Sequence, residues 1–122
     1  MELVFCCINT NARNYAKLGL LMMNDGKWNE QQIVPSHYIK QMISPVGSDD
    51  YGLSTWLSYD NELPFYWFSG HLGQYIINIP EHNMVVVRLG ETNSKDINYR
   101  FKGSIANYIR QVYLKYAFEL SQ

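Results

Sequence analysis

Residues 74–89 read QYIINIPEHNMVVVRL, and this stretch decides which fold the chain forms. Its two apolar runs, Gln74 to Ile79 and Met84 to Leu89, are rich in the Ile, Val and Tyr that favour β-strands. The residues between them, Pro80-Glu81-His82-Asn83, have the length and composition of a hairpin loop. We therefore predict two antiparallel strands. Val85 to Val87 are apolar in succession, which predicts that both faces of the second strand are covered.

Two more strands are predicted upstream of this hairpin. Tyr51 to Tyr59 is rich in aromatic residues, and Phe65 to Ser69 follows it after a turn that contains Asp60 and Pro64. The sequence thus predicts an antiparallel sheet of at least three strands between Tyr51 and Leu89. Arg88 lies inside an apolar strand, so it must find a partner or reach solvent, and we expect a structural ion pair.

Helices are predicted both before and after the strands along the sequence. The first runs from Asn11 to Asn24 with Thr10 as its N-cap, the second from Pro35 to about Ile43, and the last from about Gly103 or Ser104 to Leu120. Their apolar stripes are Ala12, Tyr15, Ala16, Gly19, Met22 and Met23 in the first; Tyr38, Ile39, Met42 and Ile43 in the second; and Ile105, Tyr108, Ile109, Val112, Tyr113, Tyr116 and Leu120 in the last. This order predicts an α+β fold in which helices cover an antiparallel sheet.

Composition excludes several classes of protein. The 122 residues suit a single domain (1–122), and a content of 47% hydrophobic and 17% charged residues excludes a disordered chain. A net charge of -1 predicts no nucleic-acid partner, and no apolar run approaches the roughly 18 residues of a membrane span. The start of the chain resembles no signal peptide. The adjacent Cys6 and Cys7 suit no disulfide, and the three scattered histidines predict no metal site. We expect no cofactor.

Three segments together resemble a known family. They are TNARNYAKLGLLMMNDGKW at 10–28, YGLSTW at 51–56, and GHLGQYIINIPE at 70–81 followed by MVVVRLG at 84–90. In this order and spacing they resemble the C-terminal part of the serine β-lactamase-like family. That family includes class C β-lactamases, penicillin-binding carboxypeptidases, esterases and 6-aminohexanoate-dimer hydrolases, and the Gly-x-x-Gly-Gln-Tyr run is most similar to the last group. The resemblance covers nearly the whole chain and implies a partial β-lactamase/transpeptidase-like fold.

The nucleophile of that family is unmatched. It belongs to a Ser-x-x-Lys motif, in which the Lys assists deprotonation of the Ser one helical turn away. No Ser-x-x-Lys occurs here, and the spacing from Ser36 to Lys40 is one residue too long. Tyr59-Asp60-Asn61 matches the family's Tyr-x-Asn motif in letters, but it lies at a predicted turn, so we attribute it to turn chemistry.

The family's third motif, Lys-(Ser/Thr)-Gly, has two possible registers here. In the favoured one, Phe68-Ser69-Gly70 occupies the motif, Phe replaces Lys, and the backbone N–H of His71 completes the oxyanion hole. In the other, His71-Leu72-Gly73 is a His-x-Gly variant. The resemblance thus implies that Ser69, Gly70 and His71 form one wall of a site that lacks its nucleophile. The structural alternative is that Gly70 and Gly73 only permit close strand approach.

The resemblance implies the C-terminal fragment of a serine hydrolase that acts on a small-molecule amide or ester. We expect this chain alone to be inactive. Its full-length relatives are often exported or periplasmic, and the compartment of this chain stays open. The strand Met84 to Leu89 would lack a neighbour in such a fragment, which predicts a homodimer; Leu3 to Ile8 folding back is the alternative.

Two other classes of function stay open. One is a standalone, non-catalytic binding module built on the same sheet. The other is an enzyme of a different class, for which His71, Glu81 and His82 offer no convincing arrangement.

Overall fold

The meander predicted from the sequence is a four-stranded antiparallel sheet in the computed structural model, which describes residues 8–59, 63–91 and 104–122. Neighbouring strands follow the chain order β3-β4-β5-β6. Their bounds are β3 (Trp56–Ser58), β4 (Phe65–Gly70), β5 (Gln74–Ile79) and β6 (Met84–Arg88). The hairpin loop is the short 3₁₀ turn η2 (Pro80–His82), which Asn83 closes with a left-handed φ of 48°. The prediction of an antiparallel α+β fold is confirmed.

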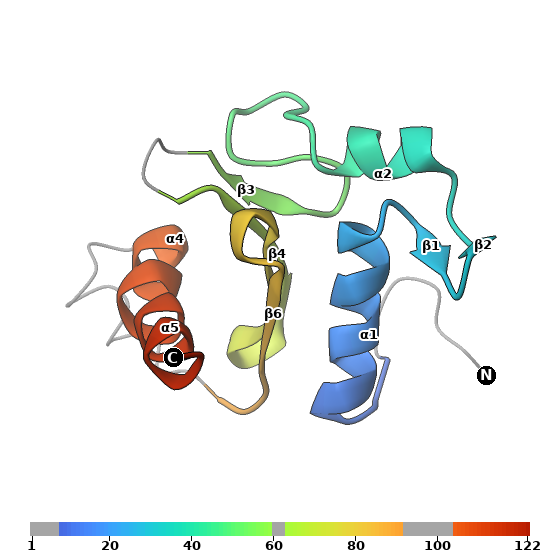
Figure 1. Ribbon diagram of the computed structural model, residues 1–122. Coiled ribbons are helices and arrows are strands. Elements are labelled where there is room, and N and C mark those ends of the chain that lie inside the picture. The colour runs from blue at the N-terminus through green and yellow to red at the C-terminus, as the bar shows by residue number, and fades with distance from the viewer. Residues whose placement is uncertain (1–7, 60–62, 92–103) are drawn as a thin grey trace.

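Helices cover both faces of this sheet (Figure 1). The N-terminal helix α1 (Ala12–Met23) lies on one side, and the C-terminal helical run lies on the other. Between α1 and the four-stranded sheet, the chain forms a hairpin of two short strands, β1 (Lys27–Trp28) and β2 (Gln31–Gln32). Helix α2 (Ser36–Met42) follows this hairpin.

The two faces of the sheet bury different sets of side chains. The register pairs Trp56 with Trp67, Trp67 with Ile77, and Ile77 with Val86, so alternate residues of every strand share one face. The first set, named here the C-terminal core, comprises Phe65, Trp67, Tyr75, Ile77, Ile79, Ile109 and Leu114. The second set, the N-terminal core, comprises Met22, Ile39, Leu57 and Tyr66.

The C-terminal helical run packs on the sheet as predicted, and its apolar face differs from the predicted one only after Tyr113. It consists of α4 (Ile105–Tyr108), the π-helical segment η3 (Ile109–Leu114) and α5 (Lys115–Leu120). Tyr116 and Leu120, predicted to be buried, are 57% and 88% exposed, whereas Leu114 is buried. The reason is the π segment, because its i→i+5 hydrogen bonding brings residues five apart, such as Ile109 and Leu114, to the same side.

Helix α1 lies very close to the sheet at Gly19. A Cβ atom at that position would lie 2.6 Å from Val85 Cγ1 and 2.7 Å from Asn78 Oδ1. The predicted stripe is otherwise confirmed, with Ala12 as its one exposed member. The predicted N-cap is wrong by one residue. Asn11, not Thr10, accepts a hydrogen bond from the backbone N–H of Asn14, at 3.0 Å.

Two further predictions are corrected. The strand predicted over Tyr51 to Tyr59 is reduced to β3, because a turn precedes it: the Gly52 N–H donates to the Thr55 carbonyl at 2.8 Å, and Ser54 has a φ of 54°. Tyr38, placed on the apolar stripe of the second helix, is 45% exposed.

Some predictions lie outside the described residues: those for Cys6 and Cys7, for Leu3 to Cys7 as a substitute strand, and for Asp60 and Asn61. In the described part of the chain, no helix has the length and apolar character to cross a bilayer.

Candidate functional site

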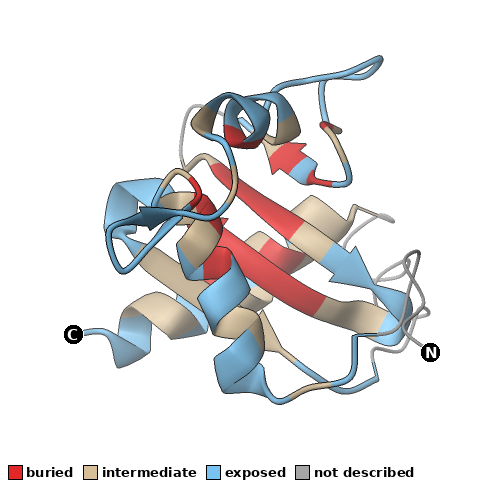
Figure 2. Ribbon diagram, turned by 90° about the vertical axis from the view of Figure 1, so that its right-hand side faces the viewer, coloured by how far each residue is buried: buried red, intermediate tan, exposed pale blue. Residues whose placement is uncertain are grey.

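One corner of the sheet is open at the end of β4. Strand β3 pairs with β4 only along Phe65 to Trp67, whereas β5 pairs with β4 as far as Gly70. Among the described residues, no strand lies beside the other edge of β4 from Phe68 onward. Ser69, Gly70 and His71 are all exposed there, and the tip of the strand is pale blue in Figure 2. The three predicted site residues thus lie together at one accessible edge, and their role stays a prediction.

The chain turns sharply just after this edge. The 3₁₀ turn η1 (His71–Gly73) joins β4 to β5, and it contains two left-handed residues, Leu72 with a φ of 58° and Gly73 with a φ of 84°. A Cβ atom at Gly70 would lie 2.9 Å from the Cβ of Gln74. The close approach of β4 and β5 is therefore a sufficient reason for a glycine at position 70, as the structural alternative predicts.

Arg88 forms no ion pair with any residue that the structure describes. Its partners in the described chain are backbone carbonyl oxygens. Nη1 donates to Gly73 O at 2.9 Å, to Leu72 O at 3.3 Å and to Gly90 O, and Nη2 donates to Glu91 O. Gly90 and Glu91 follow Arg88 closely in the sequence, whereas Leu72 and Gly73 lie fifteen or sixteen residues before it. The pairing of β5 with β6 brings Leu72 and Gly73 to the guanidinium.

The side chain of Gln74, at the start of β5, holds the loop that follows β6. Its Nε2 donates to Gly90 O at 2.8 Å, and its Oε1 accepts from the Gly90 N–H at 2.9 Å. Gly90 has a φ of 118°, which favours glycine. The role of Gln74 as an anchor was not predicted from the sequence. The available signal was Gly73 directly before it and Gly90 just after β6.

Three tyrosine hydroxyl groups, two of them beside β5 and β6 and one after β3, do not supply a base at neutral pH. Burial raises the pKa of Tyr108 to about 12, and its hydrogen bond with Tyr113, at 3.1 Å, acts in the same direction. Burial also raises the pKa of Tyr75. Tyr59, the residue that matches the family's Tyr-x-Asn motif in letters, donates its hydroxyl to the carbonyl of Ile43, and burial raises its pKa. These hydroxyl groups stay protonated.

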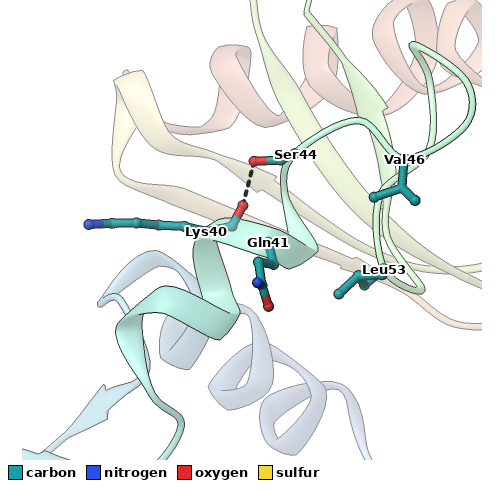
Figure 3. A pocket seen from close by; sticks show the side chains of 5 residues that line it. All are labelled: Lys40, Gln41, Ser44, Val46 and Leu53. Carbon is teal, nitrogen blue, oxygen red and sulfur yellow. Dashed lines mark hydrogen bonds between the residues drawn. The ribbon is translucent and has the colours of Figure 1, made fainter.

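The surface has a shallow depression of about 400 Å³ at the end of α2 (Figure 3). It includes a Ser and a Lys, but the Ser44 hydroxyl donates to the backbone carbonyl of Lys40 at 2.6 Å. The Lys40 side chain extends away from the hollow (Figure 3). No nucleophile–base pair forms here. A second depression, of about 480 Å³, is lined by Lys17, Leu18, Leu21, Trp28 and Ile33.

Within residues 8–59, 63–91 and 104–122, no three His, Cys, Asp or Glu side chains gather where they could hold a metal ion. The open corner of β4 offers backbone N–H and C=O groups, and such groups can bind an extended ligand or a developing oxyanion.

Comparison with known proteins finds a similarity to a solved structure. No protein-family model matches the chain, and no curated protein matches it. Among solved structures, the chain is similar to one described as "Putative 6-aminohexanoate-dimer hydrolase from Bacillus anthracis", with 26% sequence identity and a TM-score of 0.65. The match covers 90% of this chain and 29% of that structure's chain. The chain thus spans less than a third of the length of the hydrolase that it resembles.

Proposed function

We propose that this chain forms the C-terminal wall of the active site of a serine hydrolase with a β-lactamase-like fold, and that the complete site transfers the acyl group of a small-molecule amide or ester. The observation that carries the proposal is the open edge of β4, where Phe68 to Gly70 pair with β5 on one side and have no described strand on the other. The similarity to a hydrolase over 90% of the chain supports it.

The roles of the residues follow from their place at that edge. A Ser from a segment outside this chain attacks the carbonyl carbon, and its proton passes to a neighbouring base. The carbonyl oxygen then becomes an oxyanion, which accepts a hydrogen bond from the backbone N–H of His71. Ser69 and the backbone of Gly70 line the wall beside it. Phe68 replaces the family's Lys, so this wall offers no cation to a substrate carboxylate.

A hybrid enzyme tests this function. The matched segment of the similar hydrolase is replaced by residues 8–120 of this chain, and the product is assayed with p-nitrophenyl esters and a fluorophosphonate probe. We expect the hybrid to hydrolyse esters and to be labelled at its Ser-x-x-Lys serine. The isolated chain is expected to do neither, because it has no such motif. A correctly folded but inactive hybrid, or labelling of a serine in the isolated chain, contradicts the proposal.

A second part of the proposal concerns self-association. Strand β6 is the last strand of the sheet, and no described strand lies on its outer edge. Its central residues, Val85 to Val87, are apolar and half-buried. An unpaired apolar edge is a template for another strand, and a two-fold contact would pair two identical edges in a closed homodimer.

A further inference from the structure

Two loops at the same end of the sheet converge on one side chain. The turn His71–Gly73 follows β4, and residues 90–91 follow β6. Arg88 donates to a carbonyl oxygen of Leu72, Gly73, Gly90 and Glu91, so four peptide groups from two loops share one guanidinium. Five N–H donors in a rigid, planar group make Arg suited to this arrangement.

We propose that Arg88 is a positioning residue that sets the orientation of the His71 N–H at the open edge of β4. This inference rests on the proposed function, since it names the residue that holds the wall of that site in shape. Arg88 does not touch the edge itself. It acts through the carbonyl groups of Leu72 and Gly73, the two residues that directly follow His71.

The backbone of the turn explains why it needs such an anchor. Leu72 has a φ of 58°, a region that residues with a Cβ atom rarely adopt. Its side chain is 47% exposed, so apolar packing contributes little to holding it there. Hydrogen bonds from a charged donor are stronger than neutral ones, and they stabilise the carbonyl directions that this left-handed conformation requires.

Gln74 makes a separate contribution. It bonds both backbone groups of Gly90 but neither carbonyl of the turn. Removing Gln74 should therefore loosen residues 90–91 and leave His71–Gly73 in place, whereas removing Arg88 should loosen both loops. This difference separates positioning of the turn from general support of the sheet end.

NMR spectroscopy on the full chain tests the proposal without any need for activity. The variants are Arg88→Met, Arg88→Lys and Gln74→Met. Arg110→Lys is the matched control, because Arg110 lies on the same face but bonds Ser58 Oγ at 2.9 Å and stacks over Phe65. The readouts are the intraresidue HN–Hα NOE of Leu72, which is strong only at positive φ, and amide hydrogen exchange at residues 71–74.

In Arg88→Met we expect the Leu72 NOE to weaken and exchange at residues 71–74 to accelerate at least tenfold, while exchange at Ile77 in the centre of β5 is unchanged. Arg88→Lys should restore these values only in part, because one ammonium group cannot reach four carbonyl oxygens. Gln74→Met and Arg110→Lys should leave the Leu72 NOE intact. An unchanged turn in Arg88→Met overturns the proposal, as does an equal change in Gln74→Met.

If Arg88→Met does not fold, the folded Arg88→Lys variant decides by the same two readouts. The hybrid enzyme then separates this inference from the proposed function. An active hybrid in which Arg88→Lys lowers kcat with little change in KM supports both, because an oxyanion donor acts mainly in the transition state. If the hybrid is active and Arg88→Lys leaves its kcat unchanged, only the proposed role of Arg88 is overturned. An inactive hybrid with a loosened turn in the Arg88 variants overturns only the proposed function.

Discussion

Two strand edges that no described strand covers, one at the end of β4 and one along β6, differ in what surrounds their backbone groups. At the end of β4, the edge from Phe68 to Gly70 is mostly exposed and runs into a tight turn that Arg88 holds. At β6, the edge is lined by half-buried valines and supported by α1 at Gly19. Unpaired N–H and C=O groups alone therefore do not define a function. An exposed edge with a fixed turn suits a small ligand, whereas an apolar, well-supported edge suits another strand.

The largest expected effect concerns the edge of β4. In the hybrid enzyme, His71→Pro removes one backbone N–H and should lower kcat by about 10²–10³-fold, the usual loss for one oxyanion donor. Proline fits the position, because Gly70 before it is extended (φ -100°, ψ 170°) and His71 begins a 3₁₀ turn. His71→Ala keeps the N–H and is the control, with nearly unchanged kcat. Equal losses in both variants would assign the role to the imidazole instead.

The second prediction concerns the support of β6. Gly19→Ala should lower the free energy of unfolding by about 1–3 kcal/mol, because the new methyl group would overlap Val85 and Asn78. The gain in helix propensity, about 1 kcal/mol, offsets only part of the overlap. Chemical denaturation measures the change. Leu20→Ala, at a position that is 37% exposed on the same helix, is the control and should cost less.

The third prediction compares the two edges directly. Light scattering should find the full chain at twice its 14.3 kDa mass. Leu89→Lys places a charge beside the β6 edge and should weaken the dimer about tenfold, or about 1.4 kcal/mol. Leu72→Lys is a matched control at the β4 edge, since Leu72 and Leu89 are 47% and 43% exposed. A monodisperse monomer at tens of micromolar would rule out the dimer.

The smallest predicted effect is a loss of stability at alkaline pH. Burial raises the pKa of Tyr66 from 10.0 to about 12 in the folded chain. The unfolded chain therefore releases this proton first, so the stabilising contribution is complete below pH 10 and declines as the pH rises towards 12. At half a pH unit above pH 10, the free energy of unfolding should have fallen by less than about 1 kcal/mol. Denaturation of Tyr66→Phe between neutral and alkaline pH should show a shallower decline, whereas Tyr38→Phe, at an exposed position, should follow the unchanged chain.

Local pattern was sufficient for the main elements of the fold. The β-branched runs in 74–89 and the hairpin loop between them predicted β5 and β6 almost to the residue. The stripe from Tyr15 to Met23 correctly predicted the buried side of α1, because an α-helix brings residues three and four apart onto one face. The absence of Ser-x-x-Lys is likewise a property of the sequence alone.

Only the tertiary structure decided the features that depend on distant contacts. The turn from Gly52 to Thr55 limits β3 to the three residues that begin at Trp56. The end of β4 therefore lies beyond the reach of β3. The π segment replaced Tyr116 and Leu120 by Leu114 in the C-terminal core, because it rotates the face that follows it. Arg88 bonds carbonyl groups that lie up to sixteen residues away in sequence, and only pairing of β4, β5 and β6 brings them to it. Periodicity reports which side of an element is apolar, but the partners of a polar group are set by strand register and by where loops meet.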